Sequence, residues 1–518
     1  MNAAPDAARP TVAIAGATGF VGTALREHLA GRYRVVGLTR SRHRASQEAS
    51  GDGVEWRHCD LYSLLELERA MVGADVAVYL VHSMLPSSRL TQGSFADLDL
   101  VLADNFARAA AASGVRQIVY LGGLLPEDKD SLSRHLRSRW EVEKTLGAHG
   151  VPVTALRAGL VVGPGGSSLR MLVNLVRRLP AMVLPSWTDS LTQPIALRDV
   201  VRAFDLVLGA PEAYRGAFDV GGPDVMTYRE MMERTAEVLG KERKMVGVPV
   251  ITPRLSTLWV SLISGSPRAL AGPLVASLRH NMTVHDNPVQ RAIVPRALGF
   301  EAALRRSVGA SGEPLPTPRR AHRRPDDRAI RSARRVRSVQ RFDLPPGRDA
   351  EWAGMEYMRW LDGFAGPLVR VEVTPAAAGA GDAGHARGNG ESGAASGGAT
   401  TARFYAGPIW KPVLELTHAL DRSEPDRALF YVTGGLLYDC EGGARARLEF
   451  RSVLGGDCLI AAIHDFTPKL PWGLYRLTQA VAHLFVMAQF GRHLARLDRE
   501  GDAHQTRAPL APRSAPEA

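Results

Sequence analysis

The residues best suited to chemistry form a glycine-rich turn near the start of the chain. Gly16, Gly19 and Gly22 follow an apolar, strand-like run at residues 12–15, and a helical pattern then continues to about residue 31. Gly16 permits a tight turn, Gly19 lets main-chain amides approach a pyrophosphate, and Gly22 allows close packing of helix on sheet. The turn therefore predicts a dinucleotide site formed by Gly16, Thr18, Gly19, Phe20, Val21 and Gly22.

The end of the second strand-like run, residues 34–39, bears on the form of the dinucleotide. An acidic residue there would bind the 2′-hydroxyl of the adenosine ribose, but this chain has Arg40 and Arg42. A guanidinium can bind a 2′-phosphate through two parallel hydrogen bonds, so NADP(H) is favoured over NAD(H). The alternative is that both arginines are ordinary solvated charges of a loop, in which case NAD(H) remains a candidate.

Three more residues follow predicted strands and are candidates for the same site. Asp60 and Leu61 come after a strand-like run at residues 54–57, where the Asp60 carboxylate would accept a hydrogen bond from the adenine amino group. His82 ends the fourth run, on the side where the nicotinamide would lie. A loop histidine bonded only to the backbone is the structural alternative for His82.

Elements of alternating type must position these residues. Strand-like runs at residues 76–81, 117–121 and 153–157 are separated by helical patterns such as residues 96–113. Alternating strands and helices predict an α/β fold with a doubly wound parallel sheet of the Rossmann type. We expect this NAD(P)-binding domain to span residues 1–300, with residues 163–300 forming a lobe that covers the cofactor cleft.

A basic, proline-rich segment separates the two halves of the chain. The net charge is +11, and eleven arginines crowd residues 305–337. We interpret residues 301–335 as a solvated linker and expect no nucleic-acid partner, with peripheral membrane contact left open. Three cysteines without metal-ligand spacing, no export signal and no membrane-spanning run favour a cytoplasmic protein without a metal site. The sequence does not determine the oligomeric state.

The second half has the pattern of an α+β domain over residues 336–500. A strand-like run at 336–342, a helix at 349–364 and a strand at 368–373 precede a Gly/Ala/Ser-rich segment, 375–401, that we expect to be a disordered loop. Five strand-length runs at 403–410, 412–418, 428–433, 447–453 and 459–464 lead to one long helix at 472–497. We expect a curved antiparallel sheet that grips this helix, followed by a disordered tail at residues 501–518.

The first half resembles the short-chain dehydrogenase/reductases of extended or atypical type, and is closest to their NAD(P)H-binding subgroup. That subgroup includes isomerase-like reductases, nitrogen-metabolite sensors and an accessory subunit of respiratory complex I. The resemblance covers roughly residues 11–300 and rests on the glycine turn, Asp60-Leu61, residues 79–83, residues 193–195 leading to Asp199-Val200, residues 218–223 and residues 227–230.

The resemblance also implies a catalytic pair that this chain has changed. Enzymes of the family carry Tyr-x-x-x-Lys, with a Glu four residues beyond the Lys. Glu143 matches that Glu, which puts Arg139 at the Lys position and His135 at the Tyr position, while Gly122 and Gly123 stand where the active-site Ser is expected. His135 as a proton donor and Arg139 as a ribose ligand are one hypothesis; two exposed helix residues without a catalytic role are the other.

The second half is similar to an uncharacterised C-terminal domain that resembles the helix-grip fold of polyketide-cyclase and lipid-transfer proteins, on residues 447–451, 464–468 and 471–476. Two functions remain open. One is an NADPH-dependent reductase or isomerase of a small hydrophobic substrate. The other is a non-catalytic dinucleotide-binding sensor or assembly protein, whose C-terminal domain binds a lipid or quinone-like ligand.

Overall fold

The computed structural model describes residues 9–46, 53–82, 88–248, 275–316, 334–366, 368–374, 400–440 and 445–506. The chain divides into two compact units, and each combines segments that are separate in the sequence. Unit 1 comprises Met1–Leu85 and Asp99–Asp327, and unit 2 comprises Pro86–Leu98 and Arg328–Ala518. A short piece from within the N-terminal half therefore belongs to the C-terminal fold.

Unit 1 is built on a parallel sheet of seven strands in the order β12-β7-β6-β4-β1-β2-β3. The strands are β1 (Thr11–Ala15), β2 (Arg34–Thr39), β3 (Val54–His58), β4 (Val76–Tyr79), β6 (Gln117–Gly123), β7 (Val153–Ala158) and β12 (Gly216–Val220). From β1 the strands β2 and β3 are added on one side of the sheet, and β4, β6, β7 and β12 are added on the other side. Ligands of doubly wound sheets bind where the direction reverses, at the carboxyl ends of the strands.

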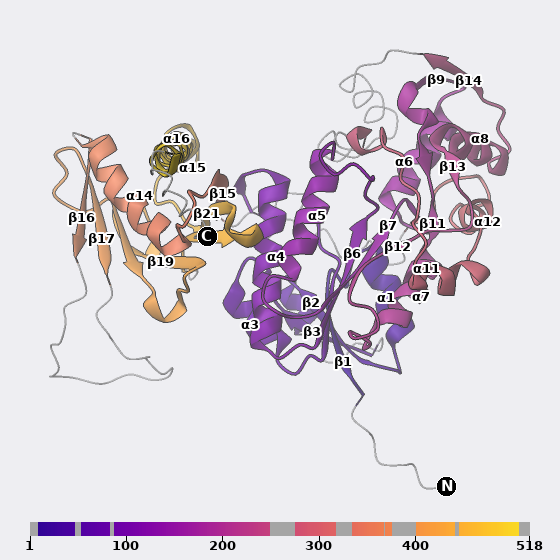
Figure 1. The fold of residues 1–518 in the computed structure, drawn as a ribbon, viewed down its shortest axis with the longest axis horizontal. Coiled ribbons are helices and arrows are strands. Elements are labelled where there is room, and N and C mark those ends of the chain that lie inside the picture. The colour runs from indigo at the N-terminus through magenta and orange to yellow at the C-terminus, as the bar shows by residue number, and fades with distance from the viewer. Residues whose placement is uncertain are drawn as a thin grey trace, which may run out of the picture. The chain divides into compact units, whose positions relative to one another are not determined.

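Helices cover both faces of this sheet. Val78 of β4 packs in a core with side chains of α1 (Phe20–Leu29) and α7 (Leu197–Val207). The next residue, Tyr79, points to the opposite face, where its ring contacts Phe106 of α4 (Phe95–Ala112) at 4.9 Å between centroids. Figure 1 shows α4 beside α5 (Arg134–Leu146) and α3 (Leu64–Met71) on that face. This layering confirms the predicted Rossmann-type α/β domain.

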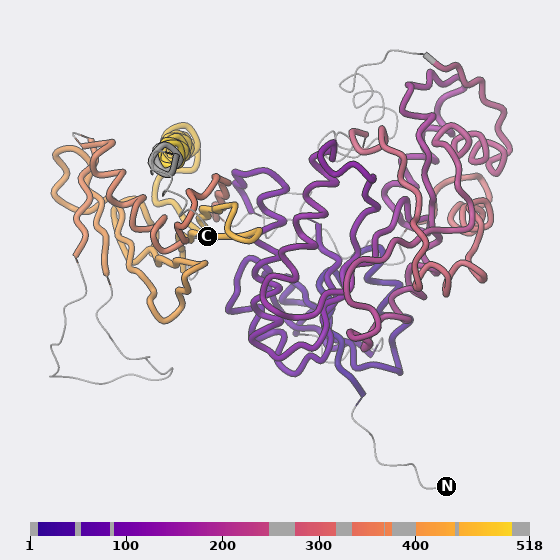
Figure 2. The backbone as a smooth tube through the Cα atoms, viewed as in Figure 1, coloured from indigo at the N-terminus to yellow at the C-terminus, as the bar shows by residue number. Residues whose placement is uncertain are grey.

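A lobe with its own apolar core completes unit 1. It is the magenta to red part of the tube in Figure 2. Leu172 of α6, Met231 of α8 and Phe300 of α12 are buried in one cluster there. The remaining elements of unit 1 are α2 (Arg42–Ala45), β8 (Val161–Val162), α6 (Ser167–Arg178), β9 (Ala181–Pro185), η1 (Ser186–Asp189), β10 (Leu191–Thr192), β11 (Ile195–Ala196), β13 (Met226–Thr227), α8 (Tyr228–Val238), β14 (Lys244–Val248), α11 (Pro288–Ile293), η2 (Val294–Arg296) and α12 (Phe300–Arg305).

The boundary predicted at residue 300 differs from the one in the structure. Phe300 and Leu304 of α12 are buried in the core of the lobe, and the Leu315 carbonyl accepts a hydrogen bond from the Gly165 amide at 2.9 Å. Residues 301–316 of the expected linker are therefore part of unit 1, because apolar side chains at helical spacing lie among the arginines. Residues 317–333 lie outside the described residues.

Unit 2 contains a sheet of eight strands in the order β16-β17-β18-β19-β20-β21-β15-β5. The strands are β16 (Val369–Thr374), β17 (Thr401–Ala406), β18 (Leu414–His418), β19 (Arg427–Gly434), β20 (Arg447–Val453), β21 (Cys458–Phe466), β15 (Val336–Asp343) and β5 (Leu90–Gln92). Neighbours from β16 to β15 are antiparallel, whereas β5 adds to β15 in parallel. Short 3-10 turns follow β18 and β20, at η4 (Leu420–Arg422) and η6 (Leu454–Gly456).

Helices α14 (Ala350–Ala365) and α16 (Gln479–Thr506) pack on this sheet. Tyr357 of α14 and Phe490 of α16 lie 5.1 Å apart between ring centroids, and both contact Phe450 of β20. The long helix expected at residues 472–497 is divided at Thr478, whose φ of −117° and ψ of −82° end α15 (Trp472–Leu477). No helix among the described residues is long and apolar enough to cross a membrane.

The two segments that we expected to be disordered lie largely outside the residues that the structure describes. Residues 375–399 of the predicted loop are not described, while Thr401, at its predicted end, already begins β17. The predicted tail at 501–518 begins too early, because α16 continues to Thr506. Residues 507–518 lie outside the described residues.

Candidate functional site

The glycine turn has the shape of a pyrophosphate cradle. Gly16 has a φ of +86°, and a Cβ atom on Gly22 would lie 2.2 Å from the Gly16 carbonyl oxygen. Helix α1 begins directly after Gly19, with no side-chain cap and no acidic residue in its first turn. The positive end of the helix is therefore not neutralised by α1's own residues, which fits a bound diphosphate. Thr18 is exposed, while Phe20 and Val21 are half-buried.

Two exposed arginines lie at the adenosine end of the predicted site. Arg40 directly follows β2, and Arg42 opens the short helix α2. Ser41 between them is buried, and its hydroxyl accepts a hydrogen bond from the Arg44 amide at 3.3 Å. This cap fixes the loop, so the two guanidinium groups project from a defined turn at the carboxyl edge of the sheet.

The turn after β3 holds Asp60 and Leu61 in place. The Asp60 carboxylate accepts from the Tyr62 amide at 3.2 Å, and the Asp60 amide donates to Glu66 at 2.8 Å. Leu61 is buried, and its carbonyl accepts from the Asn105 side chain of α4 at 2.9 Å. These bonds shape the loop, and the adenine contact of Asp60 remains a prediction.

Arg139 lies between the carboxyl ends of β4 and β6. Its guanidinium donates to the carbonyls of Val81 and Leu121 and lies 4.8 Å above the ring of Tyr120. Tyr120 in turn donates its hydroxyl to the Arg139 carbonyl at 3.0 Å. Arg139 is nearly buried, so it is not the exposed helix residue of the alternative hypothesis. These contacts tie α5 to the two strands that border the predicted nicotinamide site.

His82 forms a close pair with a buried carboxylate. Its Nδ1 lies 2.6 Å from Oδ2 of Asp99, which is completely buried on α4. Ser138 of α5 also donates to that carboxylate, at 3.5 Å. A carboxylate oxygen accepts, so Nδ1 is the donor of this hydrogen bond, and the other ring nitrogen, Nε2, is a buried atom. The sequence predicted His82 but missed Asp99, whose only signal is a charge within the apolar run from Leu98 to Leu102.

His135 lies next to this pair, and burial holds its imidazole in the uncharged form. The rings of His135 and His82 lie 5.1 Å apart between centroids. Burial, together with the nearby His82 and Arg139, lowers the pKa of His135 to about 3. The Nδ1 atom of His135 is buried and has no hydrogen-bond partner within the described part of the chain. The imidazole is therefore uncharged at neutral pH.

Two tyrosines near the pair are packed in the interior of unit 1. Tyr79 and Tyr120 are both completely buried in unit 1, and burial raises the pKa of each phenol. A proton donor must reach its substrate within hydrogen-bond distance. Both rings belong to the packed face of the sheet instead, with 6.1 Å between their centroids.

A small apolar cluster joins the segment after β6 to the lobe. It combines residues after β6 and at the start of α5 with one residue of the lobe, and its buried members are Leu124, Leu125, Leu132, Leu136 and Met282. The hydroxyls of Ser133 and Ser277 also join α5 to the lobe, at 2.8 Å. The sequence did not predict this cluster, because Met282 comes from a distant segment of the chain.

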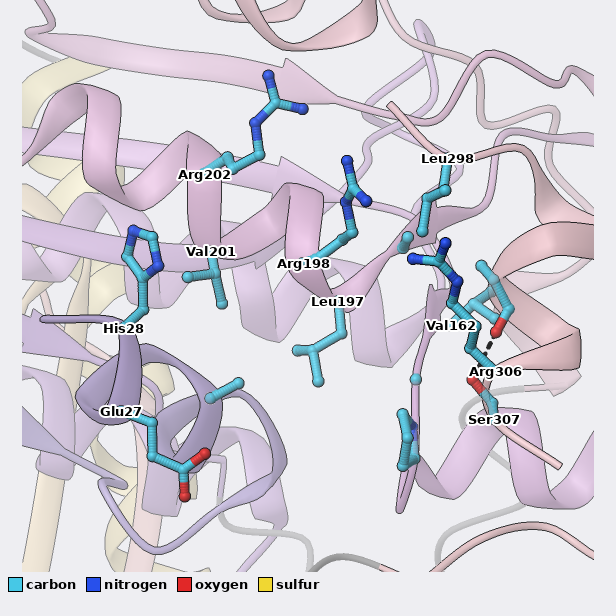
Figure 3. Close-up of a pocket in the computed structure, with 15 residues that line it drawn as sticks. Glu27, His28, Val162, Leu197, Arg198, Val201, Arg202, Leu298, Arg306 and Ser307 are labelled. Carbon is cyan, nitrogen blue, oxygen red and sulfur yellow. Dashed lines mark hydrogen bonds between the residues drawn. The ribbon is translucent and has the colours of Figure 1, made fainter. Parts of the chain in front are cut away.

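A separate pocket of about 530 Å³ lies between α1, α7 and the segment around α12. Figure 3 shows His28 of α1 and Arg198 and Arg202 of α7 among its side chains. The Arg202 guanidinium is bound to Asp199 at 2.9 Å. None of the predicted site residues lines this pocket.

Residues 16–166 match a family model described as NAD(P)H-binding. The "Auxiliary protein GraX" of Staphylococcus aureus is 31% identical over 147 residues, which are 28% of this chain and 43% of that protein. The chain therefore matches less than half the length of this relative. The "(4-alkanoyl-5-oxo-2,5-dihydrofuran-3-yl)methyl phosphate reductase" of Streptomyces griseus is 28% identical over 232 residues, 44% of this chain and 74% of that protein.

Among solved structures, triphenylmethane reductase of Citrobacter sp. in complex with NADP(H) covers 56% of this chain and 98% of its own, with 20% identity and a TM-score of 0.44. The family match coincides with the glycine turn, the strands β1 to β7 and the helices between them. Unit 1 thus contains an NAD(P)H-binding domain of the Rossmann type.

Proposed function

We propose that unit 1 is an NADPH-dependent reductase of a small hydrophobic molecule. The observation that carries the proposal is the His82–Asp99 pair, which lies next to His135 at the carboxyl end of β4, where the direction of the sheet reverses. Carboxylate-held histidines are proton-transfer groups in many active sites. The reductase of Streptomyces griseus, matched over 74% of its length, supports reduction as the reaction.

The residues of the glycine turn would hold the diphosphate, and Arg40, with Arg42, would hold the 2′-phosphate. Bound NADPH would supply a hydride to the substrate. The proton that completes a reduction would come from His82 Nε2, while Asp99 keeps the ring oriented and balances the charge of the imidazolium. We infer a hydrophobic body for the substrate from the apolar cluster that includes Leu136, the residue after His135.

His135 and Arg139 take roles other than those expected from their family positions. An uncharged His135 offers the substrate a neutral hydrogen-bonding group beside His82. Arg139 positions the ends of β4 and β6 through two main-chain carbonyls, which is a different task from binding a ribose. The proposed site thus contains a donor from the segment after β4, a neutral imidazole from α5 and a structural arginine.

We also propose that unit 2 has the helix-grip fold and binds an apolar ligand. The strand order supports this, because β16 to β21 are neighbours in sequence order and β15 closes the series beside β21. The first helix, α14, follows β15, and α16 follows β21, and both pack on the same core as Phe450. Delipidated protein should take up a fluorescent fatty acid if this proposal is right.

A comparison of His82→Asn with the wild type tests the reductase proposal. Asparagine can still hydrogen-bond to Asp99 but cannot transfer a proton, so kcat for NADPH oxidation with quinones and hydrophobic carbonyl compounds should fall about 10²- to 10⁴-fold. The dissociation constant for NADPH should change by less than about twofold, since His82 only borders the nicotinamide. Equal kcat in both proteins would contradict the role of His82.

The alternative is a non-catalytic NADPH sensor or assembly protein. The contacts of Arg139 favour it, because the residue at the family's Lys position is engaged by the protein itself. This alternative predicts tight NADPH binding without oxidation of the cofactor by any acceptor. In that case we expect bound NADPH to change the affinity of unit 2 for its own ligand.

A further inference from the structure

Three loops of unit 2 run side by side at one end of its sheet. The Leu436 amide donates to the Pro412 carbonyl, and the Leu437 amide to Val413, each at 3.1 Å. The Lys469 amide donates to the Leu437 carbonyl, also at 3.1 Å. Main-chain hydrogen bonds thus join loops 407–413, 435–439 and 467–471 into one surface, from which α15 departs.

Large apolar side chains are exposed across this surface. Trp410, at the tip of the loop between β17 and β18, is 95% exposed, and Ile409 beside it is also exposed. Leu436 is exposed on the adjoining loop. Leu368 is exposed beside the first loop, because its carbonyl accepts a hydrogen bond from the Gly407 amide at 2.9 Å. Leu474 and Leu477 continue the series along α15. We call these six residues the apolar rim.

Most of the charges on the same loops are positive, and the exception is Asp439 on the second loop, which is half-buried. Lys411 follows Trp410 directly, and Lys469 and Arg476 are exposed on the third loop and on α15. No acidic residue occurs in residues 400–414 or between Asp465 and Asp498. A soluble protein seldom exposes a tryptophan so completely, whereas Trp, Leu and interleaved Lys or Arg are the side chains of the membrane interface.

We propose that the apolar rim docks unit 2 on a bilayer that contains anionic lipid. The tips of the loops would enter the region between headgroups and acyl chains, and Lys411, Lys469 and Arg476 would contact lipid phosphates and carboxylates. A bilayer fits better than a protein partner, because the fully exposed indole of Trp410 and the other exposed apolar groups lie among cations. The proposal is independent of the reaction assigned to unit 1.

Co-sedimentation of the full chain with phosphatidylcholine vesicles, with and without phosphatidylserine, tests this docking. The wild type should bind vesicles with phosphatidylserine, and added salt should weaken the binding. Trp410→Ala should lower the affinity about tenfold, since a buried indole side chain removes a large apolar area from water. Lys411→Glu should weaken binding to anionic vesicles more than to neutral ones.

Leu420→Ser is the matched control, because Leu420 is also an exposed leucine but follows the opposite end of β18. Leu420→Ser should leave vesicle binding unchanged. Because all three substitutions replace exposed residues, the thermal unfolding of each variant should match that of the wild type. Absence of binding to both vesicle types would overturn the proposal. So would binding that Trp410→Ala and Leu420→Ser reduce equally, or a dimer that Trp410→Ala dissociates while vesicles are not bound.

Discussion

Arg40 is the residue on which the choice between NADPH and NADH depends. Arg40→Ala should weaken NADPH binding by about 1.5–3 kcal/mol, the usual contribution of a hydrogen bond to a charged group. The affinity for NADH should stay the same, because NADH lacks the 2′-phosphate. Isothermal titration calorimetry with both dinucleotides measures the difference. Wild-type protein that binds NADH as tightly as NADPH would contradict the assignment of Arg40.

The depressed pKa of His135 has a consequence for stability against acid. In the unfolded chain an unperturbed histidine takes up a proton below about pH 6.5, whereas the folded protein delays this until about pH 3. The unfolded state therefore binds more protons between these values, and the free energy of unfolding falls as the pH falls. At about pH 5 the loss due to His135 should be about 1–2 kcal/mol.

His135→Gln should remove that part of the acid sensitivity. Urea unfolding of unit 1 at about pH 7 and about pH 5 should show a smaller decrease for the variant than for the wild type. Other histidines cancel in this comparison, since both proteins contain them. An equal decrease in both proteins would mean that His135 titrates normally in the folded state.

At the level of the element, α14 offers two glycines with opposite expectations. A Cβ atom on Gly354 would lie 2.8 Å from the ring of Phe430, whereas one on Gly363 would meet no atom within 4 Å. Gly354→Ala should therefore destabilise unit 2 by about 1–3 kcal/mol through overpacking. Gly363→Ala should stabilise it by up to about 1 kcal/mol, because alanine has the higher helix propensity.

Calorimetric unfolding of the two variants beside the wild type checks this pair. The transition assigned to unit 2 should move down for Gly354→Ala and up for Gly363→Ala. A shift in the same direction for both would show that α14 does not pack against β19 through Gly354.

Strand β5 links the two halves of the sequence at the level of the whole molecule. It lies between β4 and α4 along the chain but pairs with β15, and Gln92 donates to the Ala480 carbonyl at 3.2 Å. Asp97, in the same segment of unit 2, forms an ion pair with Arg341 at 2.8 Å. Unit 2 therefore takes one edge of its sheet from residues that the sequence places beside His82.

Gly93→Val tests this arrangement. Gly93 has a φ of +150°, and a Cβ atom there would lie 2.7 Å from the Val339 carbonyl oxygen. The substitution should separate β5 from β15 and destabilise unit 2 by about 1–3 kcal/mol, although the residue belongs to the N-terminal half. Hydrogen exchange should become faster at β15, and a change confined to unit 1 would contradict the pairing.

The sequence by itself determined the elements whose signal is local. The buried parallel strands are apolar runs, so the expected strand at 34–39 coincides with β2, and the glycine turn lies where its spacing predicts. The antiparallel run at 447–453 likewise coincides with β20. These patterns arise because burial and turn geometry act on residues that are close in the chain.

Only the tertiary structure determined the features that need contacts between segments far apart in the chain. Strand β5 has three residues, too few for a periodic signal, and exists because β15 provides its hydrogen bonds. The packing of α4 on β4 made Asp99 the partner of His82. The burial of His135 on α5, next to His82, lowered the pKa of its imidazole. The charge of a side chain depends on its burial and on its neighbours in space. For that reason our proposal assigns the proton transfer to His82, whereas the resemblance to the reductases had indicated His135.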